Sequence, residues 1–202
     1  MSPPKRASES TTALRASLVG HARRLIARDG ASALTMRALA AEAGCAVGLP
    51  YKVFTDRSDL VAEICHAEFN RLADASGELV TRAGTRTVGA NLAWFAEQLL
   101  GSPAVSLAHE VLADQSLAKV VTARVHQSGV GPGAFETVFA NYLAAEQQAG
   151  RVASDIDEKA FGFVLAGAIH NLIMSGDAWP RPTRRQLQRK LDAIALAIAP
   201  KP

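Results

Sequence analysis

Hydrophobic residues recur at intervals of three and four positions along most of the chain. The first such segment begins at Ala13 and stops at Gly30, a residue suited to the position just after a helix. Its repeating apolar positions are Leu14, Leu18, Ala22, Leu25 and Ile26. This spacing places them on one face of an amphipathic helix. Val and Ile rarely alternate with polar residues, so the pattern predicts an all-α fold.

The next segments are shorter and predict a helix-turn-helix. Thr35 is a suitable cap for a second helix that ends at Gly44, and Thr55 or Asp56 is a suitable cap for a further one. The apolar positions of these helices are Met36, Leu39, Ala40 and Ala43 in the first, and Leu60, Ile64 and Leu72 in the second. Short helices separated by a single-glycine turn are typical of a helix-turn-helix.

The rest of the chain predicts longer helices. They cover residues 87–100, a segment that begins at Ser102-Pro103, and residues 134–149, 155–175 and 183–199, with a break at residues 129–133. About nine helices result in all. We divide the chain into a disordered arm over residues 1–12, a three-helix helix-turn-helix domain over residues 13–60 and a larger helical domain over residues 61–202.

Composition narrows the functional classes. The two cysteines, Cys45 and Cys65, lie far apart without a Cys-x-x-Cys motif, so we predict buried free thiols in a reducing cytoplasm, with no metal and no cofactor. The N-terminal residues lack the apolar stretch of a signal peptide. The most apolar run, residues 160–174, is shorter than the ~20 residues of a membrane span. We therefore expect a soluble cytoplasmic protein.

The charge distribution favours a polyanionic partner. Residues 1–60 contain nine Lys or Arg and five acidic residues, a net charge of +4. Residues 61–180 contain seven basic and thirteen acidic residues, which gives −6, and residues 181–202 contain six basic and one acidic residue, which gives +5. A basic N-terminal domain on an acidic body favours contact with nucleic acid, although a charged surface is commonly just solvated.

The segment TMRALAAEAGCAVGLPYKVFTDRSDL, preceded by ARDGASAL, resembles the DNA-binding domain of the TetR (tetracycline-repressor-like) transcriptional regulators. The residues that carry the resemblance are Thr35, Leu39-Ala40, Ala43-Gly44, Tyr51 with Phe54, Arg57 and Asp59-Leu60. They agree with the family pattern in residue type, order and spacing over about fifty residues. The segment GRVASDIDEKAFGFVLAGAIHNLIM resembles the penultimate helix of such regulators more loosely.

The resemblance implies a cytoplasmic homodimer that binds double-stranded operator DNA, as a repressor that a small-molecule effector releases. Residues 61–202 would form the ligand-binding and dimerisation domain, with the dimer interface through residues about 156–176 and 183–199. Candidate ligand-lining residues are Trp94, Phe95, His109, Phe135, Phe139 and Tyr142. Few charged residues occupy inward positions, so we expect a largely apolar effector. The alternative for each aromatic side chain is that it only fills the core.

Five polar or charged residues are candidates for DNA contact. Thr35 can offer its hydroxyl or the amides of its helix to a phosphate, and Arg37 can reach a phosphate or a purine edge. Tyr51 and Lys52 match family positions that clasp the DNA backbone, and Arg57 replaces the usual lysine with a two-donor group. The alternatives are an ordinary cap for Thr35, a packed ring for Tyr51 and solvated surface side chains for Arg37 and Lys52.

The expected recognition helix departs from the family pattern. Its residues are Ala46, Val47, Gly48, Leu49 and Pro50, and none has a hydrogen-bonding side chain. Because proline lacks an N–H and disfavours helix at the preceding residue, we predict a late helix start, with Pro50 near the first helical position after a turn or 3₁₀ lead-in over residues 47–49. Base reading would then use contact of Ala46, Val47 or Leu49 with thymine methyls, close approach at Gly48 and groove shape, with Arg37 as the polar reader.

Two alternatives to a DNA-binding regulator stay open. The apolar recognition segment is compatible with a TetR-shaped ligand-binding protein whose specific DNA reading is weak or lost. An enzyme on a helical scaffold is least favoured, because no acid, base, nucleophile or metal-ligand group forms a recognisable constellation in the sequence.

Overall fold

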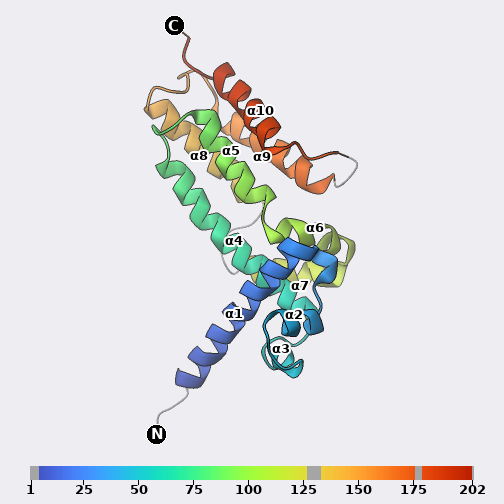
Figure 1. Ribbon diagram of the computed structural model, residues 1–202. Helices are drawn as coiled ribbons and strands as arrows, with labels where there is room; N and C mark the ends of the chain where they lie inside the picture. Colours follow the sequence, from blue (N-terminus) through green and yellow to red (C-terminus); the bar gives the residue numbers. More distant parts are fainter. Residues whose placement is uncertain (1–4, 127–132, 176–178, 202) are drawn as a thin grey trace. The chain divides into compact units, whose positions relative to one another are not determined.

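The computed structural model describes residues 5–126, 133–175 and 179–201, with the side chains of residues 5–10 excluded (Figure 1). All regular structure in these ranges is helical, in ten α-helices and one 3₁₀ turn. The elements are α1 (Lys5–Asp29), η1 (Ala31–Ala33), α2 (Met36–Glu42), α3 (Gly48–Val53), α4 (Arg57–Thr81), α5 (Val88–Leu100), α6 (Pro103–Ala113), α7 (Gln115–His126), α8 (Ala134–Gln148), α9 (Glu158–Met174) and α10 (Arg184–Ala197). The predicted all-α fold is confirmed.

Several helix ends lie where local sequence chemistry places them. Thr35, Thr87 and Thr183 precede α2, α5 and α10, and each hydroxyl oxygen accepts a hydrogen bond from the amide three residues on, at 3.0, 3.1 and 3.3 Å. Gly30 and Gly44 follow the ends of α1 and α2 with φ of 83° and 63°. These left-handed conformations favour glycine, so both residues end their helices as predicted.

Other helix ends differ from the predictions. Residues 5–12 were expected to be a disordered arm, but α1 begins at Lys5. No Pro or Gly interrupts residues 5–19, so nothing in the sequence stops the helix from extending toward the N-terminus. The ninth helix begins at Glu158 rather than near Asp155, because the Asp157 carboxylate caps it by accepting two amide hydrogen bonds at 3.0 Å.

A further break separates α6 from α7 and raises the number of described α-helices from about nine to ten. One side-chain oxygen of Asp114 accepts hydrogen bonds from the amides of Ser116 at 2.8 Å and Leu117 at 3.1 Å. This capping starts α7 one residue after Asp114. The predicted break at residues 129–133 falls mostly on residues 127–132, which lie outside the described part of the chain.

The described residues form two compact units, and the first contains the helix-turn-helix. It comprises Met1–Phe69 and Pro103–Gly129, and therefore includes α1 to α3, the first half of α4, α6 and α7. Its core includes Leu25, Leu39, Phe54, Leu107 and Val121. The domain boundary predicted after residue 60 follows the end of the sequence motif. By packing, α6 and α7 belong to the same unit as the helix-turn-helix.

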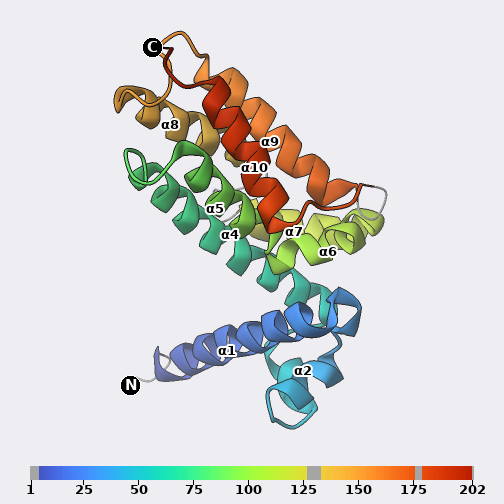
Figure 2. The same cartoon turned by 45° about the horizontal axis from the view of Figure 1, so that its top comes forward.

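The second unit comprises Asn70–Ser102 and Val130–Pro202. In it α8 runs along α9 and α5 along α10 (Figure 2). A glycine lies at each of these two crossings. A Cβ atom at Gly162 of α9 would stand 2.7 Å from the carbonyl oxygen of Glu136, and one at Gly89 of α5 would stand 2.8 Å from the Cα atom of Asp192. The absence of side chains therefore lets these helix pairs approach closely.

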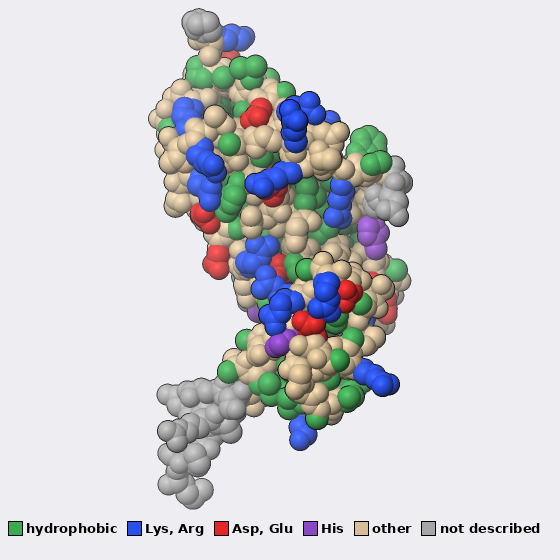
Figure 3. Space-filling model, in the orientation of Figure 1, with side chains coloured by type: hydrophobic (Ala, Val, Ile, Leu, Met, Phe, Trp, Pro, Cys, Tyr) green, Lys and Arg blue, Asp and Glu red, His purple; other side chains and the backbone are tan. Residues whose placement is uncertain are grey.

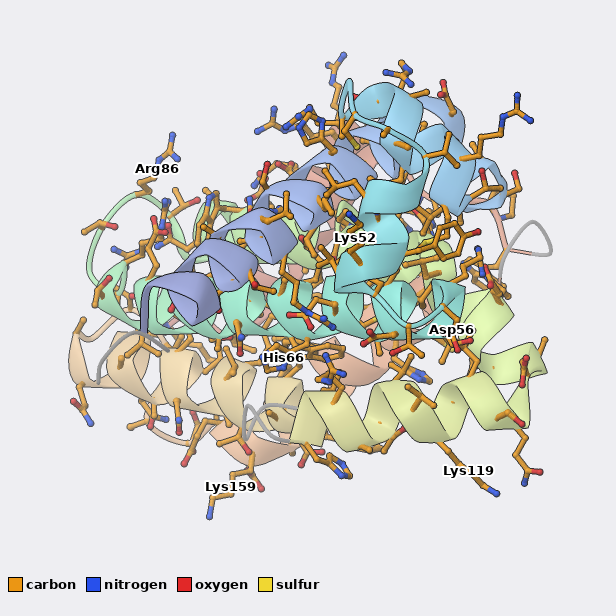
Figure 4. The ribbon with its side chains drawn as sticks, turned by 90° about the horizontal axis from the view of Figure 1, so that it is seen from below. Lys52, Asp56, His66, Arg86, Lys119 and Lys159 are labelled. Atoms are coloured by element: carbon orange, nitrogen blue, oxygen red, sulfur yellow. The ribbon has the colours of Figure 1, made fainter. Side chains whose placement is uncertain are left out.

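A buried polar network ties the turn between α4 and α5 to α8 in the same unit. The carboxylate of Glu146 is fully buried and accepts hydrogen bonds from the Tyr142 hydroxyl at 2.5 Å and the Gly84 amide at 3.1 Å. It also lies 3.2 Å from the guanidinium of Arg151. Burial, together with the bond to Glu146, raises the pKa of Tyr142, so this hydroxyl stays protonated. Arg86 projects outward from the turn (Figure 4).

Candidate nucleic-acid interface

Helices α2 and α3 are held on the first unit by buried apolar side chains. Met36 and Leu39 of α2 and Phe54, just after α3, belong to its core. Thr35 and Arg37 at the start of α2 are exposed. The core side chains therefore fix the orientation of both short helices and leave the polar start of α2 open to solvent.

Helix α3 begins at Gly48 and is six residues long. The prediction that regular helix does not start at Ala46 is confirmed, and a turn closed by the Leu49 amide on the Ala46 carbonyl, at 2.9 Å, leads into the helix. The predicted position of Pro50 is wrong, because it is the third helical residue and not the first. Proline is tolerated there since the first amides of a helix have no intrahelical acceptor, so its missing N–H costs no hydrogen bond.

One face of α3 and of the turn before it is open to solvent. The exposed residues are Ala46, Val47, Gly48, Tyr51 and Lys52. Val47 is 51% and Tyr51 57% exposed, whereas Leu49 is half-buried and Pro50 is buried. Hydrophobic side chains gather over α2 and α3, and isolated basic side chains project from the same end of the molecule (Figure 3). Lys52 is one such cation on α3 (Figure 4). The face is therefore apolar at its N-terminal half and polar at its C-terminal half.

Arg57, the predicted phosphate contact at the start of α4, is engaged within the protein. Its Nε donates to the carbonyl oxygen of Leu34 at 2.7 Å, and both terminal nitrogens pair with the carboxylate of Glu110 on α6, one of them at 2.9 Å. The hydrogen bonds to Glu110 raise the pKa of Arg57. Arg57 thus joins α4 to the loop before α2 and to α6, a role that the sequence did not reveal because Glu110 lies 53 positions away.

A second ion cluster joins α1, α4 and α7. Arg15 of α1 and Arg124 of α7 both bind Asp59, at 2.8 and 3.0 Å, and both bind Glu63, at 2.9 and 2.5 Å. Arg15 also donates to the carbonyl oxygen of the last residue of α3 at 2.7 Å. Burial opposes the ionisation of Asp59, but the Thr55 amide and the Arg15 guanidinium outweigh it and lower its pKa. The cluster therefore fixes the end of α3 on the first unit.

This geometry agrees with a known regulatory domain. The sequence pattern of the family described as bacterial regulatory proteins, tetR family, matches residues 18–64. Residues 18–64 therefore match the DNA-binding domain of that family. The matched residues run from the middle of α1 into α4 and so contain the whole helix-turn-helix. None of the curated proteins compared with the chain matches it.

Solved structures resemble the chain over nearly its whole length. A TetR-family transcriptional regulator from Pectobacterium atrosepticum is 16% identical with a TM-score of 0.61, over 96% of this chain and 98% of that one. A TetR transcriptional regulator from Streptomyces coelicolor is 22% identical with a TM-score of 0.57, over 93% and 99%. A proposed regulator from Saccharomonospora viridis, solved with choline, is 18% identical with a TM-score of 0.64, over 94% and 100%. At these identities the likeness establishes a TetR-like fold.

The residues predicted to line a ligand site of this TetR-like fold lie in two places. Trp94, Phe95, Phe135, Phe139 and Tyr142 belong to the core of the second unit or pack against it. The ring of Phe95 contacts those of Phe139 and Phe135 edge to face, with centroids 5.4 and 6.2 Å apart. His109 is exposed on α6 in the first unit. A surface hollow of about 820 Å³ is lined instead by α9, the loop before α10 and α10, and by none of these six residues.

The sequence analysis predicted two buried free thiols and no metal site. Cys45, which follows the turn after α2, is half-buried rather than buried, whereas burial raises the pKa of Cys65 to about 12. Both are free thiols. Within residues 5–126, 133–175 and 179–201, no group of three or more His, Cys, Asp or Glu side chains is placed to hold a metal ion. No helix among the described residues is long and apolar enough to cross a membrane.

Proposed function

We propose that this TetR-family protein is a cytoplasmic, non-enzymatic transcriptional regulator that binds operator DNA sequence-specifically as a homodimer. The observation that carries the proposal is the open face of the helix-turn-helix, where Arg37, Tyr51 and Lys52 are exposed beside the capped start of α2. A helix-turn-helix places such a face in the major groove. Its polar edge then contacts phosphates, and its centre contacts the bases.

The proposed phosphate contacts are those that the protein leaves open. The hydroxyl of Thr35, the phenol of Tyr51 and the ammonium of Lys52 lie at exposed positions on α2 and α3. Arg57 is the exception, because its guanidinium is occupied by Leu34 and Glu110. We therefore assign Arg57 the role of holding the start of α4 in place, and not a direct phosphate contact.

Selection of DNA from a random-sequence library tests sequence-specific binding, and fluorescence anisotropy at several salt concentrations tests the phosphate contacts. Replacing Lys52 by Ala should weaken binding to all sequences and reduce the slope of log K against log salt by about one for each half-site. Lys119, an exposed lysine on α7 (Figure 4), provides the matched control, and Lys119→Ala should leave the slope unchanged. Failure to enrich any sequence would favour the alternative of a TetR-shaped ligand-binding protein without specific DNA reading.

The proposed dimer interface uses residues about 156–176 and 183–199, of which residue 176 lies outside the described part. Helix α9 exposes a stripe of mostly small and apolar side chains, namely Ala160, Phe163, Val164, Gly167, Ala168 and Asn171. Phe163 is 65% exposed, and Leu196 of α10 is 79% exposed. Such a face supports an isologous contact with a second copy, because burying it removes apolar area from water.

Light scattering after size exclusion tests the interface. Phe163→Asp should convert the dimer to a monomer, because a charge at the centre of an apolar interface loses its hydration without gaining a partner. Leu112 of α6 is also 65% exposed, and Leu112→Asp provides the control that should remain dimeric. A Phe163→Asp protein with the mass of a dimer would place the interface elsewhere.

We further propose that the regulator is a repressor released by a small, largely apolar effector that binds at the aromatic cluster of the second unit. The support is the apolar character of Phe95, Phe135 and Phe139 and of their surroundings. His109 lies on the other unit, so we leave it out. Thermal-shift and DNA-release assays with probes from choline to indole test the idea. Indole should raise the melting temperature and release DNA, and choline should do neither.

A further inference from the structure

We propose that the helix-turn-helix reads the C5-methyl groups of pyrimidines, so that DNA binding depends on methylation at that carbon. The ligand chemistry is a thymine or 5-methylcytosine methyl in the major groove. The inference rests on the proposed DNA binding and specifies what the exposed face of α3 recognises. It extends the expected contact with thymine to a second base that carries the same methyl group.

The side chains exposed at the start of α3 are apolar. Ala46, Val47 and Gly48 form the N-terminal half of the open face, and none has a side-chain donor or acceptor. Val47 is 51% exposed, so about half of this apolar residue is open to solvent. The polar groups of α3, on Tyr51 and Lys52, lie one turn later. Hydrogen bonding by side chains to base edges is therefore unavailable at the start of α3.

Gly48 leaves open space on this face. A Cβ atom there would meet nothing within 4 Å, and the residue lies within a helix, so neither sterics nor backbone conformation requires glycine. In a helix glycine costs roughly 1 kcal/mol relative to alanine. The missing side chain leaves the backbone at Gly48 open, which lets another molecule approach it closely.

The major groove of DNA presents a matching apolar group. Among the groups that the four bases present in the major groove, the thymine C5-methyl is the apolar one, and the others are hydrogen-bond donors or acceptors. Cytosine methylated at C5 presents a methyl group at the corresponding position. An apolar face with an exposed valine is complementary to that group and not to the hydrogen-bond donors and acceptors of the base edges.

The experiment uses the full-length protein and a site selected from random DNA. Each thymine of the selected site is replaced by uracil, which removes only the methyl, and each position is also prepared as cytosine and as 5-methylcytosine. Burying one methyl group changes affinity roughly fourfold. At one or more positions we expect uracil to bind about fourfold more weakly than thymine and 5-methylcytosine about fourfold more tightly than cytosine.

Two variants assign the effect to this face. Val47→Ala should reduce the thymine-to-uracil ratio toward one and leave affinity for the uracil duplex nearly unchanged, because the methyl contact is already absent there. Val120, a 42% exposed valine on α7, provides the matched control, and Val120→Ala should keep the full ratio. Circular dichroism checks that both variants fold.

The outcomes separate the two proposals. If no sequence is enriched, DNA reading is absent and both proposals fall. If a site is enriched but uracil equals thymine and 5-methylcytosine equals cytosine at every position, the regulator stands and methyl reading is overturned. A methyl effect that Val47→Ala leaves intact would overturn the assignment to this face.

Discussion

Replacing Gly162 with alanine tests the close packing of α8 on α9, which sets the face of α9 proposed for dimerisation. Gly162 is buried, and the added Cβ would stand 2.7 Å from the carbonyl oxygen of Glu136 and 3.0 Å from the Cβ of Ala140. Neither obstacle can rotate away, because one is backbone and the other is fixed to it. The two helices must therefore move apart.

Two effects of opposite sign determine how much Gly162→Ala changes the free energy of unfolding. Overpacking of a close contact costs about 1–3 kcal/mol, whereas alanine in place of a helical glycine stabilises by roughly 1 kcal/mol. Because the obstacle at 2.7 Å is backbone, we place the packing cost at the upper end of its range. The expected net loss is about 1–2 kcal/mol, which lowers the melting temperature of a chain of this size by about 2–8 °C.

Gly77 provides the matched control. It lies at an exposed position of α4, and a Cβ there would meet nothing within 4 Å. Gly77→Ala should therefore raise the melting temperature by about 2–4 °C. Both variants are melted at one protein concentration, since dimerisation would otherwise shift the midpoint. A rise in melting temperature for Gly162→Ala similar to that of Gly77→Ala would refute the packing argument.

Three further predictions concern polar contacts. Despite burial, the Thr55 amide and the ion pairs of Asp59 hold its pKa in the folded protein below the ordinary value for an aspartate, about 3.9. The stability that ionised Asp59 contributes is therefore present above that ordinary value and is lost as pH falls through the folded pKa. Asp59→Asn should flatten the dependence of stability on pH below about pH 4, in acid titrations followed by circular dichroism. Arg57→Ala should lower the midpoint of urea unfolding by an amount worth about 1–3 kcal/mol, and Arg57→Lys should lower it less, because lysine keeps the charge opposite Glu110. Glu146→Leu should destabilise by roughly 2–4 kcal/mol in the same assay, because it leaves the Tyr142 hydroxyl and a cation without their acceptor; stability equal to the native chain would show that the network is dispensable.

The sequence predicted the helix ends that depend on neighbouring residues. Thr35, predicted as a cap, caps α2 with its hydroxyl group, and Gly30 ends α1 through its own conformation. Thr87 and Thr183, at which predicted helices begin, cap α5 and α10 in the same way. These effects act within three or four positions and are legible in one sequence. Asp114 carries the same kind of signal for the start of α7, and the hydrophobic pattern around it masked the break.

The contacts that hold the candidate interface were not predictable in the same way. Arg57 was assigned to phosphate because the family motif places a cation there, and the motif does not include its partner Glu110, 53 positions away. The cluster of Arg15 and Arg124 on Asp59 likewise joins residues 44 and 65 positions apart. Periodicity shows that a charged residue faces outward from its own helix, but a second helix can cover that face.

These contacts decide how DNA-binding variants should be interpreted. Val47 and Lys52 are exposed, so substitutions there alter contact chemistry and leave the core intact. Arg57 and Asp59 hold the helices of the first unit together. Their loss should therefore change the geometry of all the proposed DNA contacts at once. A variant that has lost a phosphate contact shows a reduced salt slope. We therefore expect Arg57→Ala to weaken DNA binding with the slope unchanged. A slope reduced by about one for each half-site would instead return Arg57 to the phosphate contacts.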